Sequence, residues 1–122
     1  MKQILVVDDE PMLRSLVGRM LTDAGYSVLE AADGGEALHV LERFGRDLAL
    51  VISDMVMPKV NGIELLERLS LSHRGLPVLL MSGYRERELL AQGLAAPCAM
   101  LEKPFSSAAL LAEVRRCLVG AA

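Results

Sequence analysis

The sequence predicts an α/β fold in which a five-stranded parallel sheet carries helices on both faces. Short apolar runs of strand length alternate along the chain with segments whose apolar residues recur at helical spacing. Parallel strands need a crossover long enough for a helix, so strict alternation favours a parallel sheet between two helical layers. The 122 residues match the length of one domain, and we expect residues 1–122 to form a single domain.

The elements follow from these two periodicities and from Gly and Pro residues near their ends. We expect strands at residues 3–7, 27–31, 48–52, 77–81 and 99–101. We expect helices from Pro11 to near Gly25, over 34–44, over 63–69 after a loop bounded by Pro58 and Gly62, over 85–94, and from near Ser106 to Leu118.

The composition of the strands predicts their order in the sheet. The first, third and fourth are continuous apolar runs, which is typical of inner strands buried on both sides. The second and fifth are shorter or more polar and suit the edges. These features fit the doubly wound, flavodoxin-like order 2-1-3-4-5, whose switch point lies between strands one and three and whose ligands bind at the carboxyl ends of the strands.

Composition excludes several classes of function. The 13 basic and 16 acidic residues leave a net charge of -3, which argues against a nucleic-acid module, and the 3% of aromatic residues argues against a base-stacking surface. No apolar run reaches the roughly 18 residues of a membrane helix. We expect a cytoplasmic protein that binds neither nucleic acid nor membrane. Its two cysteines, Cys98 and Cys117, are expected to be small packing residues without a disulfide.

Polar side chains follow the predicted strands where they end. Asp8 and Asp9 follow the first strand, Asp54 the third, Ser82 the fourth and Lys103 the fifth. Each has a simpler interpretation alone: the first two could cap a helix, and the others could be ordinary turn or solvated residues. Because the carboxyl ends of parallel strands share one edge, we expect all five to converge there.

The chemistry of such a cluster is limited. Neighbouring carboxylates repel one another, and Mg²⁺ relieves this while leaving positions for phosphate oxygens. A carboxylate beside the metal can attack phosphorus and form an aspartyl phosphate. Lys103 could then meet the added charge, and the Ser82 hydroxyl could donate to a phosphoryl oxygen.

Four motifs resemble the receiver domain of bacterial two-component response regulators. They are Val-Val-Asp-Asp-Glu at 6–10, Ser-Asp-Met-Val-Met-Pro at 53–58 with Gly62, Met-Ser-Gly-Tyr at 81–84, and Lys-Pro-Phe at 103–105. The resemblance covers the whole chain. The stretch 81–84, with the compact segment 93–100, is similar to receivers fused to hybrid sensor histidine kinases. With no effector domain or linker visible after Val119, we expect a stand-alone regulator or a domain of a larger protein.

The resemblance implies a phosphorylation-dependent signalling switch rather than a metabolic enzyme. Its partner would be a histidine kinase or phosphotransfer domain, and it would be a monomer or a weak dimer on phosphorylation. The implied roles are phosphoacceptor for Asp54, Mg²⁺ ligand for Asp9, Asp54 and the Val56 backbone carbonyl, water-mediated ligand for Asp8, switch hydroxyl for Ser82 and phosphate-contacting cation for Lys103.

Two features of the switch region are specific to this sequence. The family usually has Tyr or Phe three residues before the lysine, where this chain has Met100, which has no ring to flip. Val56 and Tyr84 occupy the positions that flank the approach of water to the phosphorus in the resembled family. Neither can position a water, so we expect slow loss of the phosphoryl group.

Three other functions remain as alternatives. A Mg²⁺-dependent phosphohydrolase using an aspartyl phosphate typically has a second Asp two residues after the nucleophile, where this chain has Val56. A flavin-binding domain of the same architecture would need hydroxyl and Gly residues after the first strand, where this chain has acids. A receiver that only binds partners would lack part of the phosphorylation site.

Overall fold

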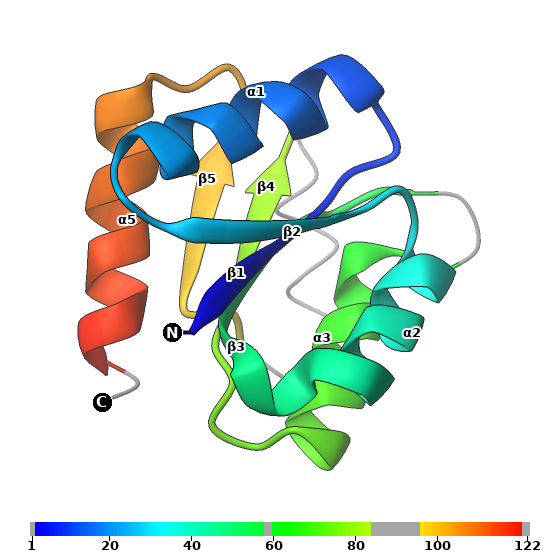
Figure 1. The fold of residues 1–122 in the computed structure, drawn as a ribbon. Helices are drawn as coiled ribbons and strands as arrows, with labels where there is room; N and C mark the ends of the chain where they lie inside the picture. The colour runs from blue at the N-terminus through cyan, green and yellow to red at the C-terminus, as the bar shows by residue number, and fades with distance from the viewer. Residues whose placement is uncertain (1, 58–59, 84–95, 121–122) are drawn as a thin grey trace.

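The structure, a computed structural model, describes residues 2–57, 60–83 and 96–120. Five parallel strands form one sheet in the order β2-β1-β3-β4-β5, which confirms the predicted order (Figure 1). The strands are β1 (Gln3–Val7), β2 (Ser27–Ala31), β3 (Leu48–Asp54), β4 (Val78–Ser82) and β5 (Ala99–Glu102). The helices are α1 (Pro11–Asp23), α2 (Gly34–Phe44), the short 3-10 helix η1 (Gly45–Asp47), α3 (Gly62–Ser72) and α5 (Ser107–Gly120).

Helices cover both faces of the sheet. Successive strand side chains point to opposite faces, so β1 sends Leu5 and Val7 toward α2 and α3, and Ile4 and Val6 toward α1 and α5. Figure 1 shows these two pairs of helices on either side of the strands. All four of these β1 side chains are buried, as expected of an inner strand of a parallel sheet.

Most element boundaries agree with the sequence prediction; α3 runs three residues past its predicted end, to Ser72, and η1 was not predicted. Other differences lie beside the polar residues. β3 runs two residues further than expected and ends on Asp54, while β4 runs from Val78 to Ser82. The ladder continues because Asp54 pairs with Met81 of β4. Asp54 and Ser82 are therefore held by sheet hydrogen bonding rather than by a loop. The helix expected at 85–94 and Tyr84 lie outside the described residues.

The prediction of two unpaired cysteines is wrong in this structure. Cys98 and Cys117 form a disulfide, with their Cα atoms 5.5 Å apart. Cys98 lies just before β5, and Cys117 lies on the buried face of α5, which packs against that strand. The two cysteines are far apart in the sequence, but they lie close together in space because α5 folds back along β5.

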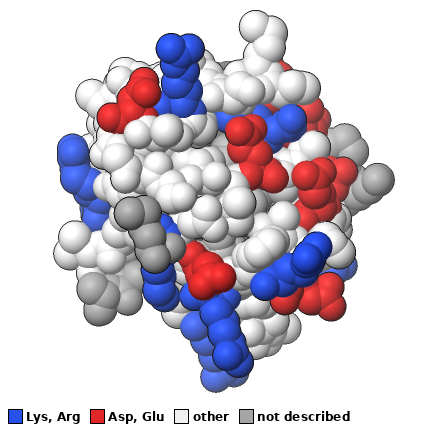
Figure 2. Space-filling model, viewed as in Figure 1, with Lys and Arg blue, Asp and Glu red and all other residues white. Residues whose placement is uncertain are grey.

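None of the helices in the described ranges is long and apolar enough to span a membrane. Figure 2 shows acidic and basic side chains interspersed over one face of the molecule.

Candidate functional site

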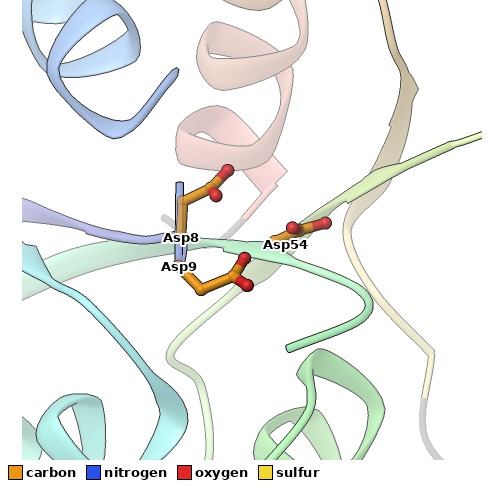
Figure 3. Close-up of side chains that lie close together, drawn as sticks. All are labelled: Asp8, Asp9 and Asp54. Carbon is orange, nitrogen blue, oxygen red and sulfur yellow. The ribbon is translucent and has the colours of Figure 1, made fainter. Parts of the chain in front are cut away.

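Three carboxylates meet beyond the carboxyl ends of β1 and β3 (Figure 3). Asp8 and Asp9 follow β1 directly, and Asp54 is the last residue of β3, the strand next to β1. One carboxylate oxygen from each lies within 4.8 Å of the others. Asp8 and Asp54 are buried while Asp9 is exposed, so the cluster opens to solvent on one side.

Asp8 is the most enclosed of the three. Its side chain has no exposed surface, one oxygen accepts the Glu10 backbone N–H at 2.8 Å, and Oδ2 accepts no hydrogen bond from the described residues. Burial raises the pKa of Asp8 above its usual value of 3.8, and the negative charges of Asp9 and Glu10 act in the same direction. The Glu10 N–H and Lys103 oppose this increase in pKa.

Lys103 supplies the positive charge of the site. Its Nζ lies 3.1 Å from Oδ1 of Asp54 and 3.8 Å from Oδ2 of Asp8. The Lys103 backbone N–H donates to the Ser82 carbonyl at 2.8 Å, which continues the β4–β5 pairing one residue past the end of β5. The Lys103–Pro104 peptide bond is cis. The lysine therefore reaches across the end of the sheet from β5 to β3.

Ser82 is the last residue of β4, the strand that lies between β3, which ends on Asp54, and β5, which precedes Lys103. Ser82 is fully buried, and its hydroxyl has no hydrogen-bond partner in the part of the chain that the structure describes. Such a group carries an uncompensated desolvation penalty, because a hydroxyl removed from water loses hydrogen bonds that nothing replaces. A phosphoryl oxygen would provide the missing acceptor.

The loop after Asp54 is anchored by main-chain contacts. Met55 N–H donates to the Met81 carbonyl at 2.9 Å, and the Gly62 N–H donates to the Met55 carbonyl at 2.9 Å. A Cβ on Gly62 would lie 2.3 Å from the Asp54 carbonyl oxygen, so only glycine fits at this start of α3. Val56 follows in this loop with an exposed side chain.

Met100 occupies the partly buried position of β5 opposite Leu80 and packs against the core on the α2–α3 side of the sheet. An apolar side chain in that environment is stabilised by packing and needs no hydrogen-bond partner.

The donor set suits a hard divalent cation. Mg²⁺ prefers oxygen ligands, usually one or two carboxylates together with waters, and this cluster offers three carboxylates at an edge open to solvent. The buried Asp8 Oδ2 without a hydrogen bond is also the kind of atom that a metal-bound water would satisfy. The residues present therefore fit the ion.

The structure brings together the five polar residues that the sequence placed at the strand ends, and it adds contacts that the sequence did not indicate. The main-chain donor to the Asp8 carboxylate is the N–H of Glu10, whose own side chain is exposed. The close approach of Gly62 to Asp54 likewise depends on how α3 begins. The motif at 53–58 includes Gly62, but neither its spacing nor any periodicity indicates these contacts.

The fold and this site define a class of protein: a doubly wound α/β domain with an acidic cluster and a lysine at the carboxyl edge of its sheet. The profile of the response regulator receiver domain matches residues 4–115. The chain therefore belongs to the response regulator receiver domain family, which confirms the resemblance.

Relatives of known sequence include both kinases and regulators. The chain is 38% identical over 117 residues to the sensor kinase CckA of Brucella abortus (strain 2308), covering 94% of this chain and 12% of that protein. It is 35% identical over 114 residues to the response regulator RppA of Synechocystis sp. (strain ATCC 27184 / PCC 6803 / Kazusa), covering 93% of this chain and 49% of that protein. The chain thus spans only part of either relative.

Solved structures of receiver domains have the same fold as this chain. The receiver domain of NtrX from Brucella abortus superposes with a TM-score of 0.87 at 32% identity, covering 96% of this chain and 98% of that one. The receiver domain from the hybrid histidine kinase CckA superposes with a TM-score of 0.80 at 36% identity, covering 95% of this chain and 98% of that one. The chain is thus a signalling domain of the two-component type.

Proposed function

We propose that Asp54 accepts a phosphoryl group from a phosphohistidine of a histidine kinase or phosphotransfer protein, in a Mg²⁺-dependent reaction that switches the conformation of the domain. The observation that carries the proposal is the position of Asp54. It ends an inner strand, it lies within 4.8 Å of two further carboxylates, and its Oδ1 is 3.1 Å from the Lys103 ammonium.

The transfer needs a nucleophile, a place for the metal and a cation for the product. A carboxylate oxygen of Asp54 attacks phosphorus, the nitrogen–phosphorus bond of the donor breaks, and its electron pair returns to the imidazole ring. When bound, Mg²⁺ would supply positive charge to the phosphoryl oxygens. The residues that would hold the ion are Asp9, Asp54 and the Val56 backbone carbonyl directly, with Asp8 through water. Lys103 lies beside Asp54 and would contact the added phosphoryl group.

Ser82 and Lys103 together would contact the phosphoryl group and stabilise the conformation of the phosphorylated state. A hydrogen bond to a charged group contributes about 1.5–3 kcal/mol, whereas moving a two-state equilibrium from 1:99 to 99:1 needs about 5.5 kcal/mol. The Ser82 hydroxyl alone is therefore insufficient, and the Lys103 contact and rearrangement of the loops must contribute. Met100 would take the place of the aromatic residue in this response.

The surface beside the site suits a helical partner. α1 begins two residues after Asp9, and it exposes Met12 at 82% and Leu16 at 49% of their surfaces. An apolar stripe next to an acidic cluster would let a partner helix dock on α1 and present its phosphohistidine to Asp54.

We propose that the domain works in the cytoplasm as a monomer that at most dimerises weakly when phosphorylated, and that residues 1–122 form one domain.

The test is Mg²⁺-dependent labelling by a small phosphodonor such as acetyl phosphate. We expect wild type and Asp47→Asn, a matched change at the opposite end of β3, to become labelled only when Mg²⁺ is present. Asp54→Asn should take up no acid-labile phosphate. Full labelling of Asp54→Asn, or equal labelling of wild type with and without Mg²⁺, would overturn the proposal.

A further inference from the structure

One side chain ties the β1–α1 loop to the neighbouring strand. Arg14, on the first turns of α1, donates from Nη1 to the backbone carbonyl of Asp8 at 2.8 Å. Its Nε donates to Oε1 of Glu30 on β2 at 3.2 Å. The Arg14 side chain is only 19% exposed. A planar guanidinium can make both contacts at once because its N–H groups point in fixed, divergent directions.

The Arg14 contact completes the restraint of Asp8. The Asp8 N–H donates to the Ala31 carbonyl at 3.2 Å, and the Asp8 carboxylate accepts the Glu10 N–H at 2.8 Å. Both of those contacts involve only main-chain groups of the partner residue. Arg14 is the side chain that holds a third polar group of Asp8, its carbonyl oxygen. The peptide that joins Asp8 to Asp9 therefore has its carbonyl oriented by Arg14.

Gly18 makes room for the partner of Arg14. It lies one helical turn further along α1, on the same face as Arg14. A Cβ at Gly18 would already lie 3.4 Å from Oε2 of Glu30, so a larger side chain would push this carboxylate away. The absence of a side chain lets Glu30 lie against α1 and reach the guanidinium.

We infer that Arg14 is a positioning residue for the carboxylate cluster, and that Glu30 keeps it in that role. The guanidinium lies against the Asp8 main chain, and if it were free it could turn to pair with a carboxylate of the cluster and compete with a divalent cation. The ion pair with Glu30 and the hydrogen bond to the main chain engage the guanidinium elsewhere. This inference rests on the proposed function in one respect, namely that the cluster binds Mg²⁺.

A role of Arg14 through its charge and a role through positioning predict opposite changes in Mg²⁺ affinity when Arg14 is replaced. If Arg14 acted only through its charge, then Arg14→Gln would strengthen Mg²⁺ binding by removing a nearby cation. If it positions the loop, then Arg14→Gln weakens binding. Loss of a group that orients a metal ligand typically weakens metal affinity about 10–100-fold, and we expect about tenfold because only the Asp8 main chain is released. Arg14→Lys keeps the charge but not the two-pronged contact, so it should also weaken binding.

The experiment measures the Mg²⁺ dissociation constant of the unphosphorylated protein by isothermal titration calorimetry. The matched control is Arg19→Gln, on the same helix, where the arginine is exposed and has no ion pair within the described residues. We expect Arg19→Gln to bind Mg²⁺ as wild type does. Glu30→Gln should weaken binding because it frees Arg14, and Arg14→Gln/Glu30→Gln should be no weaker than Arg14→Gln alone. Wild-type or tighter binding by Arg14→Gln would overturn the inference.

A second measurement separates this inference from the proposed function. Amide exchange of the Glu10 N–H, measured without Mg²⁺ at matched folded population, reports how firmly Asp8 holds its place. Exchange should be faster in Arg14→Gln and unchanged in Arg19→Gln. If wild type fails to bind Mg²⁺, the proposed function fails, while this exchange result still decides whether Arg14 positions the loop. Equal exchange in all three proteins would overturn the inference.

Discussion

Replacing Gly62 with alanine should damage the proposed phosphorylation site at Asp54 more than it damages the fold. The added Cβ would lie 2.3 Å from the Asp54 carbonyl oxygen, 2.9 Å from the Met55 Cα and 3.1 Å from the Asp54 carbonyl carbon. Ordinary contact begins at 3.4 Å, so these groups must separate by about 1 Å. All three opposing atoms belong to the main chain, which cannot rotate away as a side chain can.

The two effects of this substitution have different magnitudes. Overpacking of this kind costs typically about 1–3 kcal/mol, and we expect the upper half of that range for Gly62→Ala. Domains of this size are usually stable by about 5–15 kcal/mol, so most of the protein should remain folded. The movement also shifts the main chain that carries the Asp54 carboxylate, and a misplacement of about 1 Å can slow a reaction about 100-fold.

The assay combines urea denaturation with the rate of labelling by acetyl phosphate in Mg²⁺. The matched control is Gly120→Ala, because a Cβ at that glycine would meet nothing within 4 Å. We expect Gly120→Ala to match wild type in both measurements. Gly62→Ala should unfold at lower urea and label much more slowly even where it is fully folded. Wild-type stability and labelling in Gly62→Ala would contradict a steric role for Gly62 beside Asp54.

The buried polar groups and the disulfide give three further predictions. Burial raises the Asp8 pKa, so the folded state binds more protons than the unfolded state between pH 3.8 and the raised pKa. The contribution of Asp8 to the free energy of unfolding is therefore lost as pH rises through that window. Asp8→Asn should therefore be more stable than wild type at pH 7 without Mg²⁺, and the difference should shrink toward pH 4; an unchanged difference would contradict this. Ser82→Ala should keep or slightly raise the stability of the unphosphorylated protein, because its hydroxyl has no partner among the described residues, yet give a smaller amide-exchange response to beryllofluoride. Reduction of the Cys98–Cys117 disulfide should lower the free energy of unfolding by about 3 kcal/mol, whereas Cys117→Ser should be insensitive to reductant; equal stability of oxidised and reduced wild type would count against the bond.

The sheet order could be predicted because the burial of each strand is reflected in its amino-acid composition. β1, β3 and β4 are buried along almost their whole length and read as continuous apolar runs, whereas β2 keeps an exposed Glu30. The strand ends were harder to predict. The hydrophobic pattern stops at Ile52, but main-chain pairing with β4 continues to Asp54, and such pairing does not depend on an apolar side chain.

The convergence of the site was predictable from topology, but its internal contacts were not. Parallel strands bring Asp8, Asp54 and Lys103 to one edge whatever the loops between them contain. The bridge from Arg14 to the Asp8 carbonyl instead depends on side-chain rotamers and on the space above Gly18. The disulfide was missed for a similar reason, since it depends on which face of α5 meets β5.

Locating the phosphoryl group chemically tests most directly whether Asp54 is the phosphoacceptor. After reaction with acetyl phosphate in Mg²⁺, borohydride reduces an aspartyl phosphate to homoserine, which peptide mass spectrometry can assign to a residue. We expect homoserine at position 54 and nowhere else, because Asp54 combines an inner-strand position with the 3.1 Å contact to Lys103. Homoserine at Asp8 or Asp9 with Asp54 unmodified would contradict it.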